Sequence, residues 1–379
     1  MLVPVWLSAF RDEDLAALVE GWKREGAPFH VLIFLPEKEI ARVPAIQAIC
    51  RQHDVHVAGA VFPQLVAESR CQDQGLLAIK VTDSPAPLLL EGMSNQERVS
   101  SACRELAAHV ELSLTDDRTT SLFCIFDALV PNVATHLDAW YLALADRVNY
   151  FGVNAGSETF APMPCLFDTK RQIAYGALVQ LLPGHPGACL NHDYGVPDVL
   201  LTATSAIGNR IVQIDWQPPL EIYRNLMLSC YGVTITQENF YEHAVHFPFG
   251  ILRADGEVLV RIPVALGDDG SIFCVGEIPP NSVLTLLDAR VSNHRAHMQL
   301  ASDLIAQGTL VADEDLLLFY CAGRRMHMGP MMQDELEKIA KTTRARRVLG
   351  ALSLGEIGGA HSGGYPLFHN ATLVGVPCR

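Results

Sequence analysis

The sequence lacks any long hydrophobic run, although 49% of its 379 residues are hydrophobic. Charged residues or prolines interrupt every apolar stretch before the ~18 residues that a membrane-spanning helix needs. The N-terminus, which reads Met1-Leu2-Val3-Pro4-Val5, also lacks the basic region that opens an export signal. These absences predict a protein without a membrane segment and without an export signal.

Positive charge and paired cysteine motifs are also scarce. Lys and Arg total 28 against 42 Asp and Glu, and the resulting net charge of -14 repels nucleic-acid phosphates and anionic lipid surfaces. The ten cysteines include no C-x-x-C pair, and Cys124, Cys274 and Cys321 lie within apolar runs, where reduced cysteine packs like a small hydrophobe. We therefore expect a cytoplasmic protein whose partners are neither nucleic acid nor membrane.

Common catalytic signatures are absent as well. The chain has no G-x-S-x-G elbow, no Walker loop and no H-E-x-x-H, so the usual parts of hydrolases, NTPases and zinc proteases are missing. Three His-x-x-His pairs begin at His53, His243 and His294, but no nearby cysteine or carboxylate pattern completes a tetrahedral metal site. We expect no catalytic residues, no metal site and a function other than catalysis.

One order of elements, strand-helix-strand-strand, occurs three times along the chain. The three copies span residues 30–81, 121–182 and 316–376. In each copy an apolar strand is followed by a helix and then by two further apolar stretches. Each copy also has a glycine at or soon after its second strand, as at Gly59, Gly152 and Gly355. Either internal duplication or ordinary α/β alternation explains this repetition.

A break in texture divides the chain into two predicted lobes. Prolines and glycines concentrate at 183–187, which predicts a boundary that separates residues 1–190 from residues 191–379.

The second lobe begins with a region that differs from the three copies. Asp255-Gly256 predicts a hairpin over 250–262, and the stretches 271–275 and 282–287 would extend its sheet. Since local antiparallel pairing is mixed with helical connections, we predict an α+β fold of layered mixed β-sheets with flanking helices.

The last thirty residues combine glycines with polar side chains. Gly355-Glu356-Ile357 follows one apolar stretch, and Phe368-His369-Asn370 precedes another. A glycine turn between two strands would bring Glu356, His369 and Asn370 together beside exposed backbone amides, which predicts a polar pocket. These two elements resemble the GEI and FHN-x-T signatures at the C-terminus of the FIST family.

The resemblance extends over most of the chain. The segment Leu318-Phe319-Tyr320-Cys321-Ala322-Gly323-Arg324 resembles the family's F-x-C-AGR strand, and Val260-Arg261-Ile262-Pro263 resembles its central hairpin. Val153-Asn154-Ala155-Gly156 is similar to the GG-x-AGD segment, although Asn154 and Ser157 replace the commoner glycine and aspartate. Residues 58–63 lack the family's Ser-x-Ala-Gly-Glu turn, so no ligand contact is carried over from that turn.

The resemblance implies a FIST_N-like domain over 1–190 and a FIST_C domain over 191–379. It implies a non-enzymatic intracellular sensory protein that binds a small ligand, an amino acid or a related metabolite, at the interface of the two domains. Output would then pass to a separate signalling protein. The residues expected to line the ligand pocket are Asn154, Gly156, Arg261, Arg324, Glu356, His369 and Asn370.

Several alternatives remain open for these residues. Arg261 and Arg324 either bind a ligand carboxylate or pair with an internal acidic group, and Glu356 either binds a ligand ammonium or pairs with one of them. No cofactor is expected on the main hypothesis. Some FIST-like proteins bind haem and sense nitric oxide, and on that alternative His243 and His246 are candidate axial ligands. A third alternative is an enzyme that uses Glu356 and His369 as an acid–base pair.

Overall fold

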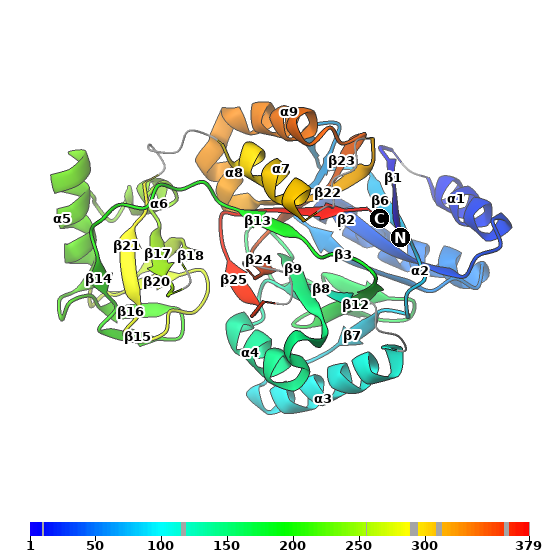
Figure 1. Cartoon of the computed structure of the whole chain (residues 1–379), viewed down its shortest axis with the longest axis horizontal. Helices are drawn as coiled ribbons and strands as arrows, with labels where there is room; N and C mark the ends of the chain where they lie inside the picture. The colour runs from blue at the N-terminus through cyan, green and yellow to red at the C-terminus, as the bar shows by residue number, and fades with distance from the viewer. Residues whose placement is uncertain are drawn as a thin grey trace.

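The computed structural model describes residues 1–9, 11–114, 119–254, 256–288, 295–307, 313–359 and 364–378. These residues form an α+β fold of mixed sheets with flanking helices, which confirms the predicted fold class (Figure 1). Three related units make up the core, and a smaller part, which we call the insert (residues 201–286), lies to one side of it. Within the described residues, no helix is long and apolar enough to cross a bilayer.

The three units share one order of elements: edge strand, helix, long strand, helix, long strand, short hairpin, long strand. Unit 1 consists of β1 (Leu2–Leu7), α1 (Asp12–Arg24), β2 (Phe29–Pro36), a 3-10 turn (Glu37–Arg42), α2 (Val43–Gln52), β3 (Val57–Phe62), β4 (Leu65–Ala67), β5 (Arg70–Gln72) and β6 (Leu76–Thr82). Unit 2 consists of β7 (Leu88–Leu90), α3 (Gln96–Ser113), β8 (Thr120–Asp127), α4 (Val133–Leu144), β9 (Asn149–Ala155), β10 (Leu166–Asp168), β11 (Gln172–Ile173) and β12 (Ala177–Pro183). Unit 3 consists of β13 (Cys189–Asn191), α7 (Ala296–Ala306), β22 (Asp315–Cys321), α8 (Ala322–Met328), α9 (Met332–Thr343), β23 (Arg347–Ser353), β24 (Glu356–Gly358), β25 (Leu367–His369) and β26 (Leu373–Pro377).

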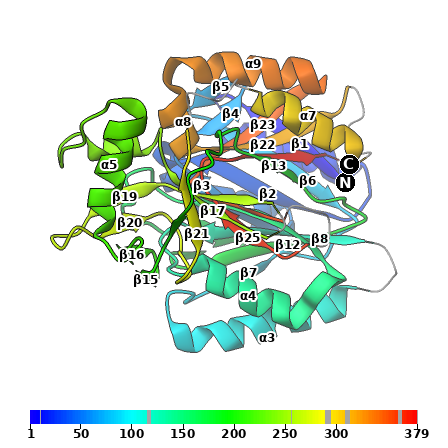
Figure 2. The ribbon, with the colours of Figure 1, turned by 60° about the vertical axis from the view of Figure 1, so that its left-hand side comes forward.

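The first long strand is paired in the same way in every unit. It runs parallel to the second long strand and antiparallel to the last: β2 lies between β3 and β6, β8 between β9 and β12, and β22 between β23 and β26. The repeated unit predicted from the sequence is therefore confirmed, and its constant connectivity favours duplication over chance alternation. Helix pairs cover the outside: α1 packs on α2 (Figure 1), and α3 packs on α4 and α7 on α9 (Figure 2).

The units exchange their short hairpins in a ring. β10 of unit 2 pairs with β3 of unit 1, β24 of unit 3 with β9 of unit 2, and β4 of unit 1 with β23 of unit 3. Each hairpin thereby extends the sheet of another unit, and the result is three six-stranded sheets of matching order. This cyclic exchange among three equivalent units is the arrangement expected of approximate three-fold symmetry.

A glycine occupies the same point in each of these sheets. Gly59, Gly152 and Gly350 lie on the second long strands, opposite the middle of the incoming hairpin strand. A Cβ added at any of them would lie 1.9–2.1 Å from a carbonyl oxygen of the first long strand, so no side chain fits. The register makes Gly350 the third equivalent, rather than Gly355, which follows the strand.

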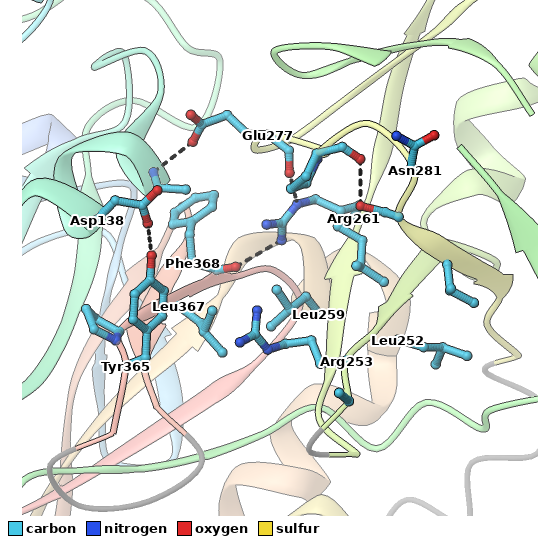
Figure 3. Close-up of a pocket in the computed structure, with 17 residues that line it drawn as sticks. Asp138, Leu252, Arg253, Leu259, Arg261, Glu277, Asn281, Tyr365, Leu367 and Phe368 are labelled. Carbon is cyan, nitrogen blue, oxygen red and sulfur yellow. Dashed lines mark hydrogen bonds between the residues drawn. The ribbon is translucent and has the colours of Figure 1, made fainter. Parts of the chain in front are cut away.

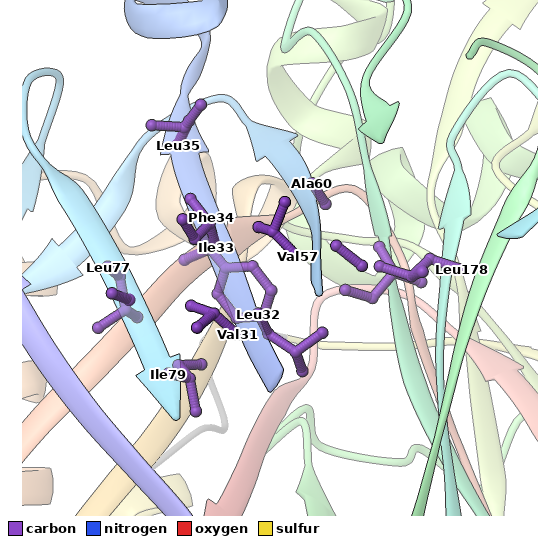
Figure 4. Close-up of a cluster of buried hydrophobic side chains, with 14 of the residues drawn as sticks. Val31, Leu32, Ile33, Phe34, Leu35, Val57, Ala60, Leu77, Ile79 and Leu178 are labelled. Carbon is purple, nitrogen blue, oxygen red and sulfur yellow. The ribbon is translucent and has the colours of Figure 1, made fainter. Parts of the chain in front are cut away.

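The apolar core is centred where the three units meet. Leu32, Phe123 and Leu317 occupy equivalent positions on the first long strands, and all three line one small internal void. Phe319 lies beside this void, with ring centroids 5.7 Å from Phe123 and 5.8 Å from Phe34. Figure 4 shows part of this cluster, in which side chains of β2 lie between those of β6 (Leu77 and Ile79) and those of β3 (Val57 and Ala60), with Leu178 of β12 beyond β3. Because these strands are covered on both faces, their sequences are continuous apolar runs, which made them predictable.

The insert interrupts unit 3 between β13 and α7 (Figure 1). It contains two four-stranded sheets and two helices. Its elements are β14 (Leu201–Thr202), β15 (Ser205–Ile207), β16 (Arg210–Gln213), α5 (Pro219–Tyr231), α6 (Phe240–Ala244), β17 (Phe249–Leu252), β18 (Val258–Arg261), β19 (Pro263–Leu266), β20 (Ile272–Cys274) and β21 (Val283–Leu286).

The hairpin expected over 250–262 is present as β17 and β18, although the turn residue Asp255 lies outside the described residues. β21 extends its sheet as expected. The prediction that 271–275 joins the same sheet was wrong, because β20 pairs with β16 and β19 in the other sheet. The chain changes sheets at Pro263, which has no N–H to continue the ladder of β18.

The lobe boundary expected at 190 stays a prediction. The hairpin exchange joins segments from both sides of it: β4 and β5 belong to a sheet with β22, β23 and β26, and β24 and β25 belong to a sheet with β8 and β9.

Candidate functional site

Three adjoining hollows lie along the junction between the insert and the core. We name them the Arg261 cleft (about 730 Å³), the Asn154 hollow (about 390 Å³) and the Asn370 hollow (about 60 Å³). The cleft and the Asn154 hollow share two lining residues, Glu277 and Phe368. The Asn154 and Asn370 hollows share four, Phe160, Val264, Val275 and Leu354.

The Arg261 cleft has walls from both parts of the molecule (Figure 3). The insert contributes β17, β18 and residues 279–283, and the core contributes α4 and the chain around the start of β25. Leu252, Leu259 and Leu367 make much of the wall apolar, and Arg253 and Arg261 bring positive charge to it. Asp138 and Glu277 also line the cleft, so its charged groups are of both signs, and the partners of each group decide which charge is left for a ligand.

Arg261 is the buried charge of the cleft. It is only 2% exposed, and burial lowers the pKa of its guanidinium to about 10, so it remains positive at neutral pH. Its Nε donates to the Glu277 carbonyl (2.8 Å), and its Nη1 donates to the carbonyls of Val260 (3.0 Å) and Phe368 (2.9 Å). Across the described part of the chain, no carboxylate lies within 4.0 Å of this guanidinium. The alternative of an internal ion pair with Glu356 is therefore not realised.

Carboxylates near the cleft have other partners. The Glu277 carboxylate accepts from the Ala134 N–H (2.8 Å) and the Thr135 hydroxyl (2.7 Å) in the first turn of α4. Tyr365 donates its hydroxyl to Asp138 of α4 (Figure 3). These contacts fix the core side of the cleft. The Arg261 guanidinium itself lies against three carbonyl groups and over the Phe368 ring, 5.8 Å from the ring centroid.

Asn154 lies near the end of β9 and is 2% exposed. Its backbone N–H donates to the Gly355 carbonyl (2.8 Å), and its carbonyl accepts from the Leu354 N–H (2.9 Å). Its side-chain Oδ1, in contrast, has no hydrogen-bond partner among the described residues. Gly156, two positions later, has φ 135° and donates to the Val61 carbonyl (2.9 Å), and it lines none of the three hollows.

Asn370 is placed in a similar way at the smallest hollow, and it is 1% exposed. Its Nδ2 donates to the His369 carbonyl (2.9 Å), and its backbone carbonyl accepts from the Thr372 hydroxyl (2.8 Å). Its Oδ1 also lacks a partner within the described ranges. Two residues that line adjoining hollows thus each hold a buried carboxamide oxygen without a partner among the described residues.

Glu356 is fully buried behind these hollows. It accepts from the Ser353 hydroxyl (2.5 Å) and the Thr372 N–H (3.3 Å) and contacts the thiol of Cys321, which lines the Asn370 hollow. Burial raises its pKa to about 7, although the hydrogen bonds from Ser353 and Cys321 oppose the rise. Glu356 is thus poised between its neutral and charged forms.

His369 pairs with Glu356 across β24 and β25. Its Nε2 lies 3.2 Å from the Gly358 carbonyl and 3.6 Å from a Glu257 carboxylate oxygen, and burial lowers its pKa to about 3. Neither Glu356 nor His369 lines any of the three hollows. This geometry gives no support to the acid–base alternative.

Arg324 occupies a different setting from Arg261. It forms a two-point ion pair with Glu335 of α9 (2.6 and 3.0 Å), and Tyr320 donates to the same carboxylate (2.6 Å). This is the internal pair that the sequence left open for an arginine, and Arg324 lines none of the three hollows. Its role in ligand binding stays a prediction that the geometry does not favour.

The candidate haem ligands lie away from the three hollows. His246 Nδ1 lies 2.7 Å from His327 Nδ1, and no histidine of the described residues lines a hollow. His294 lies outside the described residues. The described part of the chain contains no group of three or more His, Cys, Asp or Glu side chains suited to a metal. Haem binding stays a prediction without support from a cavity.

Sequence reasoning missed Phe160, Glu277 and Tyr365, which line the hollows. Phe160 lies in the loop between β9 and β10, which is longer than the corresponding loops of the other two units. An alignment of the three repeats would have revealed that extra length. No local signal distinguishes Glu277 or Tyr365, because their place depends on how the insert meets α4.

Comparison with known families gives two matches. The FIST N domain matches residues 30–217, and the FIST C domain matches residues 219–359. The border between the two matches falls in the insert, between β16 and α5. A comparison with curated proteins finds no match.

Proposed function

Because the chain belongs to the FIST family, we propose that it is a sensory protein that binds a small anionic ligand in the Arg261 cleft. FIST domains are described as small-ligand sensors in signal transduction. The proposed ligand is a carboxylate, such as an amino acid or a related metabolite, whose anionic group contacts Arg261.

The observation that carries this proposal is that the buried Arg261 guanidinium has no carboxylate partner among the described residues. A buried charge is costly unless it is paired, and the three carbonyl groups satisfy donors of the guanidinium without neutralising it. An anion in the cleft would supply the missing charge. Arginine suits this role, because its planar fork binds a carboxylate through two parallel hydrogen bonds.

The size and lining of the cleft support the same ligand class. Its volume of about 730 Å³ falls within the roughly 300–1,000 Å³ of typical small-molecule sites. Its lining combines apolar residues, three leucines among them, with charged and hydroxyl-bearing side chains that would fix the orientation of a ligand.

Position in the molecule supports a sensory role. A ligand in the cleft would contact β18 of the insert and β25 of the core at once. If the ligand binds one arrangement of the insert and the core more tightly than another, its binding shifts the population toward the tighter-binding arrangement. In the proposal, a separate signalling protein reads this difference.

A panel of small carboxylates, amino acids and uncharged metabolites tests the proposal by thermal melting. We expect at least one carboxylate to raise the melting temperature of the wild type and to lose most of this effect in Arg261→Gln, because a charge-assisted hydrogen bond contributes about 1.5–3 kcal/mol. Arg210→Gln is the matched control. Arg210 also lies on the insert but pairs with Asp269 (2.5 Å) and lines none of the three hollows. Equal ligand shifts in both variants would refute the role of Arg261.

A further inference from the structure

The β17–β18 hairpin sets the order of side chains along the Arg261 cleft. Ile251 lies opposite Leu259 in the antiparallel register, and Phe249 lies opposite Arg261 two positions further along. Alternate residues of a strand, and residues directly opposite each other, lie on the same face of a sheet. Arg261, Leu259 and Ile251 therefore share one face, and all three line the cleft. The charge of Arg261 is thus followed along the hairpin by an apolar pair.

The core contributes a third apolar side chain to this place. Leu367 of β25 also lines the cleft, and it directly precedes Phe368, whose carbonyl accepts from Arg261 (2.9 Å). Although Leu367 comes from the core, it belongs to the same hydrophobic cluster as Ile251 and Leu259. In Figure 3, Leu259 and Leu367 extend from the two walls of the cleft, below the guanidinium of Arg261 in this view. A group bound at Arg261 therefore has apolar surface of both the insert and the core next to it.

Arg253 marks the far end of this apolar stretch. It follows β17, its N–H donates to the Glu257 carbonyl (3.0 Å), and its side chain lines the cleft. Glu257 precedes Arg261 by four positions, which is about 13 Å at the rise of an extended strand. Figure 3 shows Leu259 between the two arginines. The apolar stretch is bounded by a charge at each end, so it suits a chain of several carbons rather than a long one.

We propose that the Arg261 cleft selects carboxylates that carry an unbranched apolar chain of several carbons. The carboxylate contacts Arg261, and the chain packs between Ile251 and Leu259 on the insert and Leu367 on the core. This inference rests on the proposed function, because it places the carboxylate at Arg261. It goes further by naming the ligand class: acids such as hexanoate are favoured over acids of the same charge with little or no chain.

Burial of the chain provides the selection. Every carboxylate makes the same charged contact with Arg261, so this contact does not distinguish a short acid from a longer one. Each CH2 that leaves water for an apolar wall raises the affinity by about threefold. Since the chain contacts both the insert and the core, a longer chain also favours more strongly the arrangement in which Leu367 lies near Leu259.

Calorimetric titration of the wild type with sodium propionate, butyrate, pentanoate and hexanoate tests the proposal. We expect the affinity to rise about threefold with each CH2, which amounts to about thirtyfold from propionate to hexanoate. Hexan-1-ol, which has the chain without the charge, should bind about tenfold more weakly than hexanoate or worse. Equal affinity for propionate and hexanoate would overturn the proposal, as would equal affinity for hexanoate and hexan-1-ol.

Variants of the apolar walls locate the chain. Leu259→Ala and Leu367→Ala should each reduce the preference for hexanoate over propionate by about threefold to tenfold, because part of the chain then loses its apolar contact. Leu286→Ala should keep the full preference. Leu286 is the matched control, since it is a buried leucine of the same cluster that lines none of the three hollows.

Thermal melts verify that these variants fold, and the wild-type series decides the proposal for any that does not. A preference that stays unchanged in both Leu259→Ala and Leu367→Ala would overturn the placement of the chain and with it the proposal.

Arg261→Gln separates this inference from the proposed function. All four acids should lose affinity in that variant by the same factor, about tenfold or more, because they share the charged contact. If the four acids bind equally well and all depend on Arg261, the proposed function stands and the chain selection is wrong. If hexanoate binds Arg261→Gln as tightly as wild type, the role of Arg261 is refuted. If the wild type binds none of the acids, the chain selection is wrong, and the wider ligand panel decides the proposed function.

Discussion

Two buried arginines show how far a residue can be interpreted from sequence alone. Arg261 lies in an apolar strand and Arg324 follows one, and the sequence left an internal partner or a ligand open for both. Arg324 binds Glu335 at two points, whereas Arg261 donates to carbonyl groups and lies over the Phe368 ring without a carboxylate partner in the described residues. The difference arises from α9, which packs back over β22, and no feature of the local sequence records that packing. Only Arg261 therefore remains a strong candidate for ligand binding.

Glu356 gives a residue-scale prediction about pH. Its folded pKa of about 7 lies above the ordinary value of 4.5, so the folded state holds the proton more tightly than the unfolded state. Below about pH 4.5 the carboxyl group is protonated in both states, and its burial does not reduce the free energy of unfolding. As pH rises through about 7, the folded state must bury the charged form, and the free energy of unfolding falls. Replacing it by Gln removes the cost, and Ser353 can turn its hydroxyl to accept from the new amide.

We expect the free energy of unfolding of Glu356→Gln, relative to wild type, to rise by about 3 kcal/mol between about pH 5 and pH 8. Urea unfolding at several pH values measures it. Glu20→Gln on the exposed face of α1 is the control for the substitution itself. A difference between Glu356→Gln and wild type that stays constant with pH would contradict the buried, proton-holding state of Glu356.

At the scale of elements, the glycine of each second long strand allows that strand to lie close against the first long strand of its unit. A Cβ at Gly152 would lie 2.1 Å from the Cys124 carbonyl oxygen and 2.5 Å from its sulfur. We expect Gly152→Ala to lower the free energy of unfolding by about 3 kcal/mol or more, at or beyond the upper end of the usual cost of overpacking. Gly59→Ala and Gly350→Ala should behave alike, since their contacts are equivalent.

Gly21 of α1 provides the control, because a Cβ there meets nothing within 4 Å. Gly21→Ala should stabilise the protein by roughly 0.5–1 kcal/mol, as expected for a helix interior. If urea unfolding placed Gly152→Ala and Gly21→Ala at the same stability, the close strand contact would not be what requires glycine.

The elements also show what sequence could and could not predict. The long strands and the helices between them were predictable, because double-sided burial and helical periodicity are local patterns. Helix α2 starts at Val43 with Pro44 in its first turn, where proline is tolerated, so the predicted helix survives its proline. The hairpin exchange was not predictable, since β24 finds its partner β9 in a different unit, and short apolar stretches do not specify a distant partner.

The candidate site was predicted in part for the same reason. Asn154, Arg261 and Asn370 do line adjoining hollows, because each follows or ends a strand whose position was predictable. Gly156, Arg324, Glu356 and His369 do not line these hollows. Their surroundings are set by the packing of unit 3 and the insert against units 1 and 2, and local sequence patterns do not predict such long-range packing.

At the scale of the whole molecule, the insert gives the core its asymmetry. The core alone repeats one unit three times, and at two of its junctions apolar residues (Val61 and Leu352, Leu65 and Leu166) hold the positions that Asn154 and Glu356 hold at the third. The insert, which interrupts unit 3, meets the third junction and the neighbouring α4, and there the buried charge and the unused acceptors occur (Figure 2). The proposed ligand site therefore lies at the one of the three repeated junctions that the insert covers in the described part of the chain.

Native mass spectrometry after exposure to a deproteinised cell extract tests this claim most directly. Wild-type protein, Arg261→Gln and Arg210→Gln are dialysed, incubated with the same extract and measured intact. We predict that wild type and Arg210→Gln carry one small bound molecule per chain, and that Arg261→Gln carries none, because the ligand's anionic group needs the Arg261 charge. Wild type that returns without any bound mass, or Arg261→Gln that retains the same mass as wild type, would contradict a ligand site in the Arg261 cleft.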